Sequence, residues 1–139
     1  MTKFGNLEKL EISQSRSWID LPEVGAGARL LVVPATESNP AYYNAMLRLS
    51  TARSKMAVRS NQITAKMVDD NRSDDRQLYP DLVIVDWENI VDENGEPAQF
   101  TRDNCADFCA QLPSWLFDRI RNEASTPERF LDVEDLVGN

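Results

Sequence analysis

The sequence predicts an α+β fold, namely a helix-dominated single domain with a small N-terminal antiparallel β element. The chain has 139 residues, which is the length of one domain. Its apolar residues alternate in the first part of the chain and recur at helical spacing in most of the rest. We therefore expect one domain over residues 1–139, with a β-rich part over about 1–36 and a helical part over about 39–136.

Residues 1–36 carry the strand pattern. The segment EKLEIS, residues 8–13, alternates between polar and apolar side chains. The segment SWIDLPEVGAGARLLVVPA, residues 17–35, gives a strand, a connection rich in Pro and Gly, and an apolar run at 30–33. This order predicts an antiparallel hairpin with a longer loop. The loop lacks the spacing of a phosphate-binding motif, and no Gly-Lys-Ser/Thr follows it.

A helix is predicted to begin at Pro40, with Asn39 as its N-cap. One stripe of this helix holds apolar residues and one arginine at helical spacing, namely Tyr42, Met46, Leu49, Arg53 and Met56. Such a stripe usually contacts a core or a partner. The surrounding run, residues 38–68, has five basic and no acidic side chains. It therefore faces an acidic partner, the acidic half of the same molecule, or solvent.

The middle of the chain is ambiguous. Residues 68–77, VDDNRSDDRQ, indicate a flexible connection or an exposed helical turn. In the next segment, LYPDLVIVDWENIV, residues 82–85 suit a buried strand, but Leu78, Leu82 and Val85 also share one helical face. Periodicity does not separate these alternatives, and we favour the helix.

The C-terminal third is predicted to be helical, with at least three helices after Phe100. Thr101 is a candidate N-cap, and Cys105 and Cys109 lie on the apolar face of the helix that follows. Pro113 ends that helix and opens the next one. A third start follows at Ser125 or Thr126, before Pro127 in the first turn.

The composition argues against most enzyme classes. The chain has no histidine, which removes Ser-His-Asp and Cys-His catalysis and the commonest general base near neutral pH. Two cysteines without histidine make a zinc site a poor expectation, so we take Cys105 and Cys109 as small apolar residues of a helix face. We expect no catalytic residues, no cofactor-binding residues and no metal ligands.

Charge is distributed unevenly. Residues 1–68 hold nine basic and five acidic side chains, a net +4, whereas the remainder holds six and eighteen, a net −12. The acidic half disfavours binding to a nucleic-acid backbone. No apolar stretch is long enough for a membrane span, and the N-terminus has no signal-peptide core. We therefore expect a cytoplasmic protein without nucleic-acid or membrane partners.

The segment VDWENIVDENGEPAQFTRDN, residues 85–104, concentrates carboxylates and invites a metal or acid/base interpretation. If Gly95 is position 6 of a calcium loop, positions 1 and 12 fall on Ile90 and Thr101, so the first ligand and the bidentate carboxylate are missing. No neighbouring feature predicts the raised pKa that a catalytic carboxyl group needs. Scaffolding is the better interpretation.

As scaffolding, this segment is a tight turn followed by an extended piece and a capped helix. Asn94-Gly95 is a favoured pair for a turn with positive φ, and Pro97 suits the start of an extended segment. Phe100 is an apolar anchor just before the Thr101 cap, in the position of a hydrophobic staple. Trp87 is a predicted core partner.

Residues 85–124 also resemble the tail assembly chaperones of long-tailed bacteriophages and prophages. The opening segment SWIDLPEVGAGARLLVVPAT resembles the β-rich start of that family. The residues that carry the main likeness are Trp87, Asp92, Gly95, Pro97, Phe100, Thr101, Asn104, Leu112, Pro113 and Trp115.

The resemblance implies a non-enzymatic protein that binds the tape-measure protein and helps tail-tube protein assemble around it. It also implies a place in the bacterial host cytoplasm, absence from the mature virion and, in many relatives, a second, frameshifted longer form. Candidate partner-binding residues on the basic helix are Arg48, Arg53 and Arg59. The alternative is an acidic DNA mimic that blocks a nucleic-acid-binding host factor. The net charge of −12 on residues 69–139 suggests it.

Overall fold

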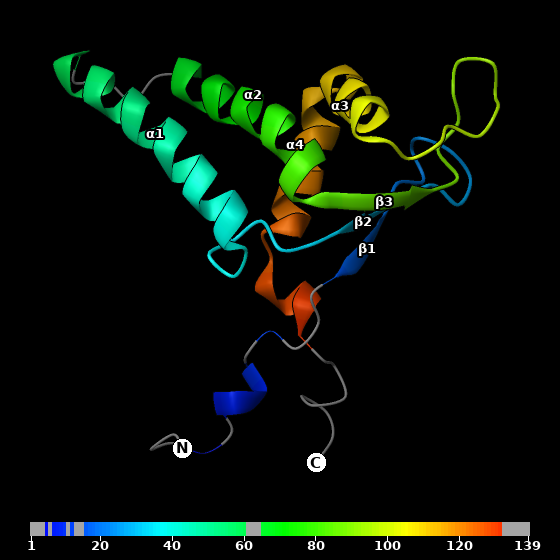
Figure 1. The fold of residues 1–139 in the computed structure, drawn as a ribbon, viewed down its shortest axis with the longest axis horizontal. Coiled ribbons are helices and arrows are strands. Elements are labelled where there is room, and N and C mark those ends of the chain that lie inside the picture. The colour runs from blue at the N-terminus through cyan, green and yellow to red at the C-terminus, as the bar shows by residue number, and fades with distance from the viewer. Residues whose placement is uncertain (1–4, 6, 11, 13–15, 61–64, 132–139) are drawn as a thin grey trace.

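The structure is a computed structural model that describes residues 5, 7–10, 12, 16–60 and 65–131, with the side chains of 8, 9 and 54–60 left out. Figure 1 shows a small sheet with helices gathered against it. The elements in chain order are η1 (Leu7–Leu10), β1 (Ser17–Asp20), β2 (Arg29–Val32), α1 (Pro40–Ser60), α2 (Ala65–Leu82), β3 (Ile84–Glu88), α3 (Arg102–Gln111), α4 (Ser114–Ala124) and η2 (Pro127–Phe130). The predicted helix-dominated α+β fold is confirmed.

The sheet is antiparallel, with the strand order β1-β2-β3. The predicted hairpin is present, because β1 pairs with β2 in a register that sets Ile19 opposite Leu30. A bulge in the β2–β3 pairing shifts the register after Leu31. Because a bulge inserts one extra residue, Ile84 and Trp87 both turn to the buried face although they are three residues apart.

The helical interpretation of residues 78–91 is wrong beyond Leu82. The helix α2 ends there, and β3 begins at Ile84. Pro80 lacks the N–H that an interior helix position needs, so it favours an early helix end. Val83, Ile84 and Val85 are β-branched and fit a pleated strand, for which β2 already offers a partner.

Two further expectations are corrected. Residues 7–10 form the 3-10 helix η1 where alternation suggested a strand, because a short alternating run without a partner does not make a stable strand. Of the two alternatives for residues 68–77, the helical one is correct, but these residues belong to the long helix α2 rather than to a single exposed turn, and Asp74 and Asp75 are buried. After Phe100 the chain forms α3, α4 and the 3-10 helix η2, and residues 132–136 lie outside the described part.

The core lies between one face of the sheet and the helices. Its strand residues are Ile19, Leu30, Val32, Ile84 and Trp87, and its helix residues include Tyr79, Cys105, Cys109, Phe117 and Ile120. Tyr79 of α2 packs edge-on against Tyr42 of α1 and Phe117 of α4, with ring centroids 5.9 and 5.5 Å away. Three helices therefore converge on one aromatic side chain.

Both outer edges of the sheet carry hydrogen bonds to side chains. On β1, Arg129 Nη1 donates to the carbonyl of Trp18 at 2.9 Å, and Arg119 Nη2 donates to that of Asp20 at 3.1 Å. On β3, Asp86 accepts from the N–H of Trp87 at 2.8 Å. Such groups prevent another strand from pairing with an edge.

The helix α1 lies at the periphery of the molecule. In Figure 1 it runs along the left edge, on the side of α2 away from α3. Asn39 caps it as predicted, since its Oδ1 accepts from the N–H of Tyr42 at 3.3 Å. The same side chain donates to the carbonyl of Leu82 at 2.8 Å, which ties the start of α1 to the end of α2. None of the described helices is long and apolar enough to cross a membrane.

Candidate functional site

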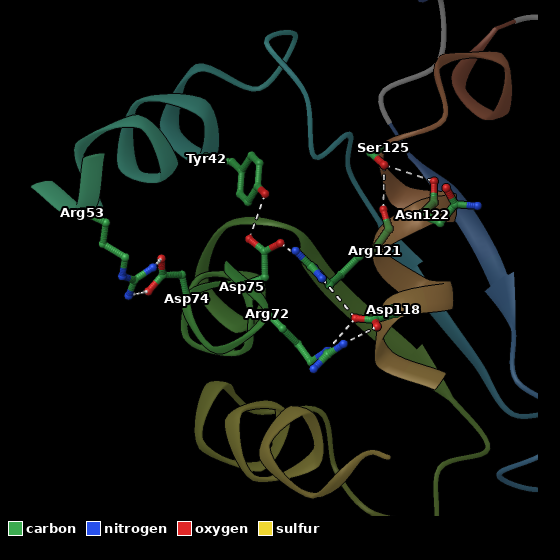
Figure 2. Close-up of polar contacts among 9 residues, drawn as sticks. All are labelled: Tyr42, Arg53, Arg72, Asp74, Asp75, Asp118, Arg121, Asn122 and Ser125. Atoms are coloured by element: carbon green, nitrogen blue, oxygen red, sulfur yellow. Dashed lines mark hydrogen bonds and ion pairs between the residues drawn. The ribbon is translucent and has the colours of Figure 1, made fainter. Parts of the chain in front are cut away.

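A network of buried and half-buried polar side chains lies between α1, α2 and α4, and we call it the ionic cluster (Figure 2). Its members are Tyr42, Arg53, Arg72, Asp74, Asp75, Asp118 and Arg121. Among the described residues, the buried charged side chains are two of the five aspartates of α2, with Asp75 5% exposed and Asp74 9% exposed. Burial of this kind requires compensating partners.

Asp75 is the centre of the ionic cluster. Its Oδ1 accepts a hydrogen bond of 2.8 Å from the Tyr42 hydroxyl, and its Oδ2 accepts one of 2.7 Å from Arg121 Nε. Burial raises the pKa of Asp75, and the bonds from Arg121 and Tyr42 oppose that rise. Burial and the nearby Asp75 charge also raise the pKa of Tyr42, so its phenol stays protonated as a donor.

The rim of the ionic cluster extends this contact on both sides. Arg53 of α1 forms a two-pronged ion pair with Asp74. Arg72 donates two hydrogen bonds to Asp118 of α4, at 2.9 and 2.7 Å, and they lower the pKa of that carboxyl group. The cluster therefore joins α2 to α1 on one side and to α4 on the other.

Two cavities flank the centre of the ionic cluster. One, of about 330 Å³, adds Asn122 and Ser125 to its lining, and the other, of about 200 Å³, lies towards Met46 of α1. The Ser125 hydroxyl donates to the carbonyls of Arg121 and Asn122, so no base in this arrangement activates it. The polar groups that line these cavities are bonded to one another, as in the pairs of Asp75 with Tyr42 and of Asp75 and Asp118 with Arg121. Among the described residues, no group of three or more acidic or thiol side chains is placed to hold a metal ion.

Trp87, Phe100 and Phe108 form a second cluster, built from two residues of the 85–104 segment and one of α3. The Trp87 ring meets Phe100 and Phe108 edge-on at 5.2 and 5.5 Å, and its Nε1 donates to the carbonyl of Ala98 at 2.8 Å. The structure thus places Trp87 in the core, as predicted, with Phe100 as its neighbour. Phe100 is partly buried and packs against the core at the Trp87 ring.

The turn in this segment has a more specific geometry than the sequence indicated. The N–H of Gly95 bonds to the carbonyl of Asp92 at 3.0 Å, and the N–H of Asp92 bonds to that of Glu96 at 2.8 Å. Gly95 has φ +80, whereas Asn94 is not among the residues with positive φ. This is a three-residue hairpin loop in which only the glycine needs the left-handed conformation. Pro97 then pairs with Val91 in an isolated bridge, in the extended segment expected there.

The remaining motif residues shape the helix starts. Thr101 Oγ1 accepts from the N–H of Asn104 at 3.0 Å, which confirms the predicted cap, and Asn104 Nδ2 donates back to the carbonyl of Gln99 at 2.9 Å. Pro113 stands at the N-cap of α4. Trp115 is 61% exposed in the first turn of α4, and none of the aromatic pairs among the described residues includes it.

The three arginines expected to bind a partner are not equivalent. Arg48 is exposed on α1. Arg53 is turned to α2, where it pairs with Asp74 and lies 3.8 Å from Asp70. The acidic groups that pair with Arg53 therefore belong to the protein itself. The side chain of Arg59 lies outside the described residues.

The sequence analysis did not identify Asp75 and Arg121 as a pair. The available signal was the spacing of Asp75 and Tyr79, one helical turn apart, if residues 68–77 had been assigned to the same helix as Leu78 and Leu82. That placement would have turned Asp75 towards the core and required a cation opposite. Nothing local in the sequence marks Arg121 as that cation, since 46 residues separate the two.

Comparison with known proteins places the chain in a family. No curated protein and no solved structure shows a significant match. A family model described as YdaY prophage protein matches residues 37–139, about three quarters of the chain, which includes every helix from α1 onward together with β3. The hairpin of β1 and β2 precedes the matched span. The chain belongs to the YdaY prophage protein family.

Proposed function

We propose that this prophage protein is a non-enzymatic tail assembly chaperone, which binds the tape-measure protein and aids assembly of the tail-tube protein around it. The observation that supports the proposal most directly is the likeness of residues 85–124 to tail assembly chaperones, in a chain whose family is a prophage family. In the structure, Trp87 of β3 packs edge-on against Phe108 of α3 and bonds to the carbonyl of Ala98, and Thr101 caps α3. A binding protein needs such a rigid frame and no reactive group.

The charge of the protein is compatible with this role. A net charge of −8 helps to keep a small protein soluble, because molecules of like charge repel one another. A complex of this protein with a partner would gain the same repulsion from other complexes. A long helical polypeptide would dock by laying an apolar face along an exposed helix, in the helix-in-groove mode. The periphery of the molecule offers such a helix in α1.

Co-expression with the tape-measure protein of the same prophage tests the proposal. We expect the tape-measure protein to remain in the soluble fraction and to co-purify with this chain. A soluble, equally acidic protein of similar size is the control, because it supplies charge without a specific surface. A tape-measure protein that stays insoluble and does not co-purify would remove the chaperone proposal.

The second candidate is an acidic DNA mimic that blocks a nucleic-acid-binding host factor. Seven exposed carboxylates within 22 residues favour it, namely Asp86, Glu88, Asp92, Glu93, Glu96, Asp103 and Asp107. Competition separates it from the first candidate: a mimic is displaced from its target by duplex DNA. Displacement by DNA, with no effect on tape-measure solubility, would favour the mimic.

A further inference from the structure

The side of α1 that faces away from α2 carries an open, shallow surface, which we call the α1 outer face. Its five residues follow one helical stripe at i, i+3, i+4, i+7 and i+8, and all are exposed: Asn44, Leu47, Arg48, Thr51 and Ala52. The stripe covers two helical turns, a length of roughly 12 Å.

The opposite side of α1 is committed to the molecule itself. Tyr42 is buried and bonds to Asp75, Met46 packs against the core, and Arg53 pairs with Asp74. Within the described part of the chain, the outer face has no such contacts, and Leu47 on it is 41% exposed. A single exposed leucine is ordinary in itself. Here it lies beside Arg48, for which no described residue provides an ion pair, and that combination sets the face apart.

The charge of the α1 outer face is opposite to that of the whole protein. Residues 40–60 contain four basic and no acidic side chains, in a chain with a net charge of −8. Arg53 is neutralised by α2, whereas Arg48 forms no ion pair with any described residue. An incoming carboxylate would therefore find an unpaired guanidinium next to an apolar side chain.

We propose that the α1 outer face docks an amphipathic helix of a partner protein whose apolar stripe is flanked by carboxylates. The apolar residues of that helix pack on Leu47 and Ala52, and its carboxylates pair with Arg48. Asn44 and Thr51 supply hydrogen bonds at the rim. The inference rests on the proposed chaperone function, to which it adds the docking face and the chemistry of the bound helix.

A second copy of this chain fits the face less well. The acidic helix α3 presents Asp103 and Asp107 to solvent, but none of the exposed large apolar side chains of the described residues lies on it. It offers no apolar counterpart to Leu47, so apolar matching favours a different protein.

The test uses the full chain and a fluorescent synthetic helical peptide with leucines at i, i+3, i+4 and i+7 flanked by glutamates. A second peptide replaces each glutamate with glutamine, so that the net charge of −8 on the protein does not attract the control. Binding is followed by fluorescence anisotropy at low and high salt. We expect the full chain to bind the acidic peptide more tightly than the neutral one. Equal binding of both peptides, or of neither, would overturn the proposal.

Three variants locate the site. Leu47→Asp should weaken binding of the acidic peptide by roughly tenfold, because it places a charge at the apolar anchor. Arg48→Glu should weaken it by roughly fivefold at low salt and less at high salt. Lys66→Glu is the matched control, since Lys66 is exposed on α2 outside this stripe, and its effect should stay within about twofold. All three positions are at the surface, so circular dichroism should report an unchanged fold.

The outcomes separate this inference from the chaperone proposal. Equal binding by wild type, Leu47→Asp and Arg48→Glu would exclude the α1 outer face. If Leu47→Asp still solubilises the tape-measure protein as wild type does, the chaperone function stands and the docking face is wrong. If wild type sediments as a dimer that Leu47→Asp dissociates, without peptide binding, the occupant is a second copy and the proposed partner is wrong.

Discussion

Arg121→Met tests whether the ionic cluster holds the helices together. The substitution keeps most of the aliphatic volume of the side chain and removes the cation opposite Asp75, which is 5% exposed. Leaving one buried charge without its partner costs about 3–5 kcal/mol. The Arg121 side chain is 24% exposed, so water compensates in part. We therefore expect a loss near the lower figure, about 3 kcal/mol at neutral pH, which lowers the melting temperature by roughly 10 °C.

The pH dependence of this loss follows from Asp75. Its pKa is raised by burial in the folded state, so the folded state binds its proton more tightly than the unfolded state does. The contribution of Asp75 to stability is therefore most favourable below about pH 3.9, the unfolded value, and falls as pH rises through the folded pKa. Removing Arg121 takes away an interaction that lowers this pKa, so the variant loses stability over a wider pH range. The difference between variant and wild type should shrink as pH falls.

Urea unfolding at about pH 5 and pH 7.5 measures both effects. The double variant with Asp75→Asn provides the control, because it removes the unpaired charge and should recover part of the loss. Asp118 also loses a partner in the variant, but it is 38% exposed on its side chain and keeps Arg72. A loss below about 1 kcal/mol, or one that is the same at both pH values, would refute the assignment of Asp75 as a charged, buried partner.

Three further predictions concern local features. Gly95→Val should lower the free energy of unfolding by about 1–2 kcal/mol, because Gly95 has φ +80, and the effect is conformational since no atom lies within 4 Å of an added Cβ. Gly95→Asn should cost less, and equal unfolding midpoints for the two variants would contradict a conformational origin. Thr101→Ala should cost about 1 kcal/mol of stability, measured by thermal unfolding, because the N–H of Asn104 loses its acceptor. Thr101→Ser is the control that keeps the acceptor, and a destabilised serine variant would point to another cause. Cys105 and Cys109 are fully buried, and the hydrogen bond with the Cys105 thiol, together with burial, raises the pKa of Cys109. Both cysteines should therefore resist a thiol reagent until denaturant is added, and fast reaction of the native protein would show that α3 opens locally.

The features that the sequence predicted well are local ones. Asn39 and Thr101 cap helices because a short polar side chain just before a helix reaches its first free N–H groups. Gly95 adopts positive φ because the turn demands it and a glycine is supplied there. The amphipathic spacing of Cys105 and Cys109 likewise places both on the buried face of α3. Each of these depends on residues within one or two turns of the chain.

The features that the sequence did not predict depend on distant partners. Ile84 and Trp87 belong to a strand only because β2, more than 50 residues earlier, offers an edge for pairing. Asp75 is buried only because Arg121 and Tyr42 meet it from two other helices. Arg53 has the spacing of a partner-binding residue, yet Asp74 neutralises it within the molecule. Periodicity reports which face of an element is apolar, but not which element will cover it.

The sheet and α1 together define how a partner would bind. On the β1 edge, the guanidinium groups of Arg119 and Arg129 donate hydrogen bonds to backbone carbonyls. On the β3 edge, Asp86 accepts a hydrogen bond from a backbone N–H. Strand addition at either edge would have to displace these bonds. Among the described residues, the α1 outer face carries no comparable contact, so docking of a helix there displaces fewer existing bonds. Under the proposed chaperone function, a contact at Arg48 that salt screens would make binding of a long helical polypeptide reversible.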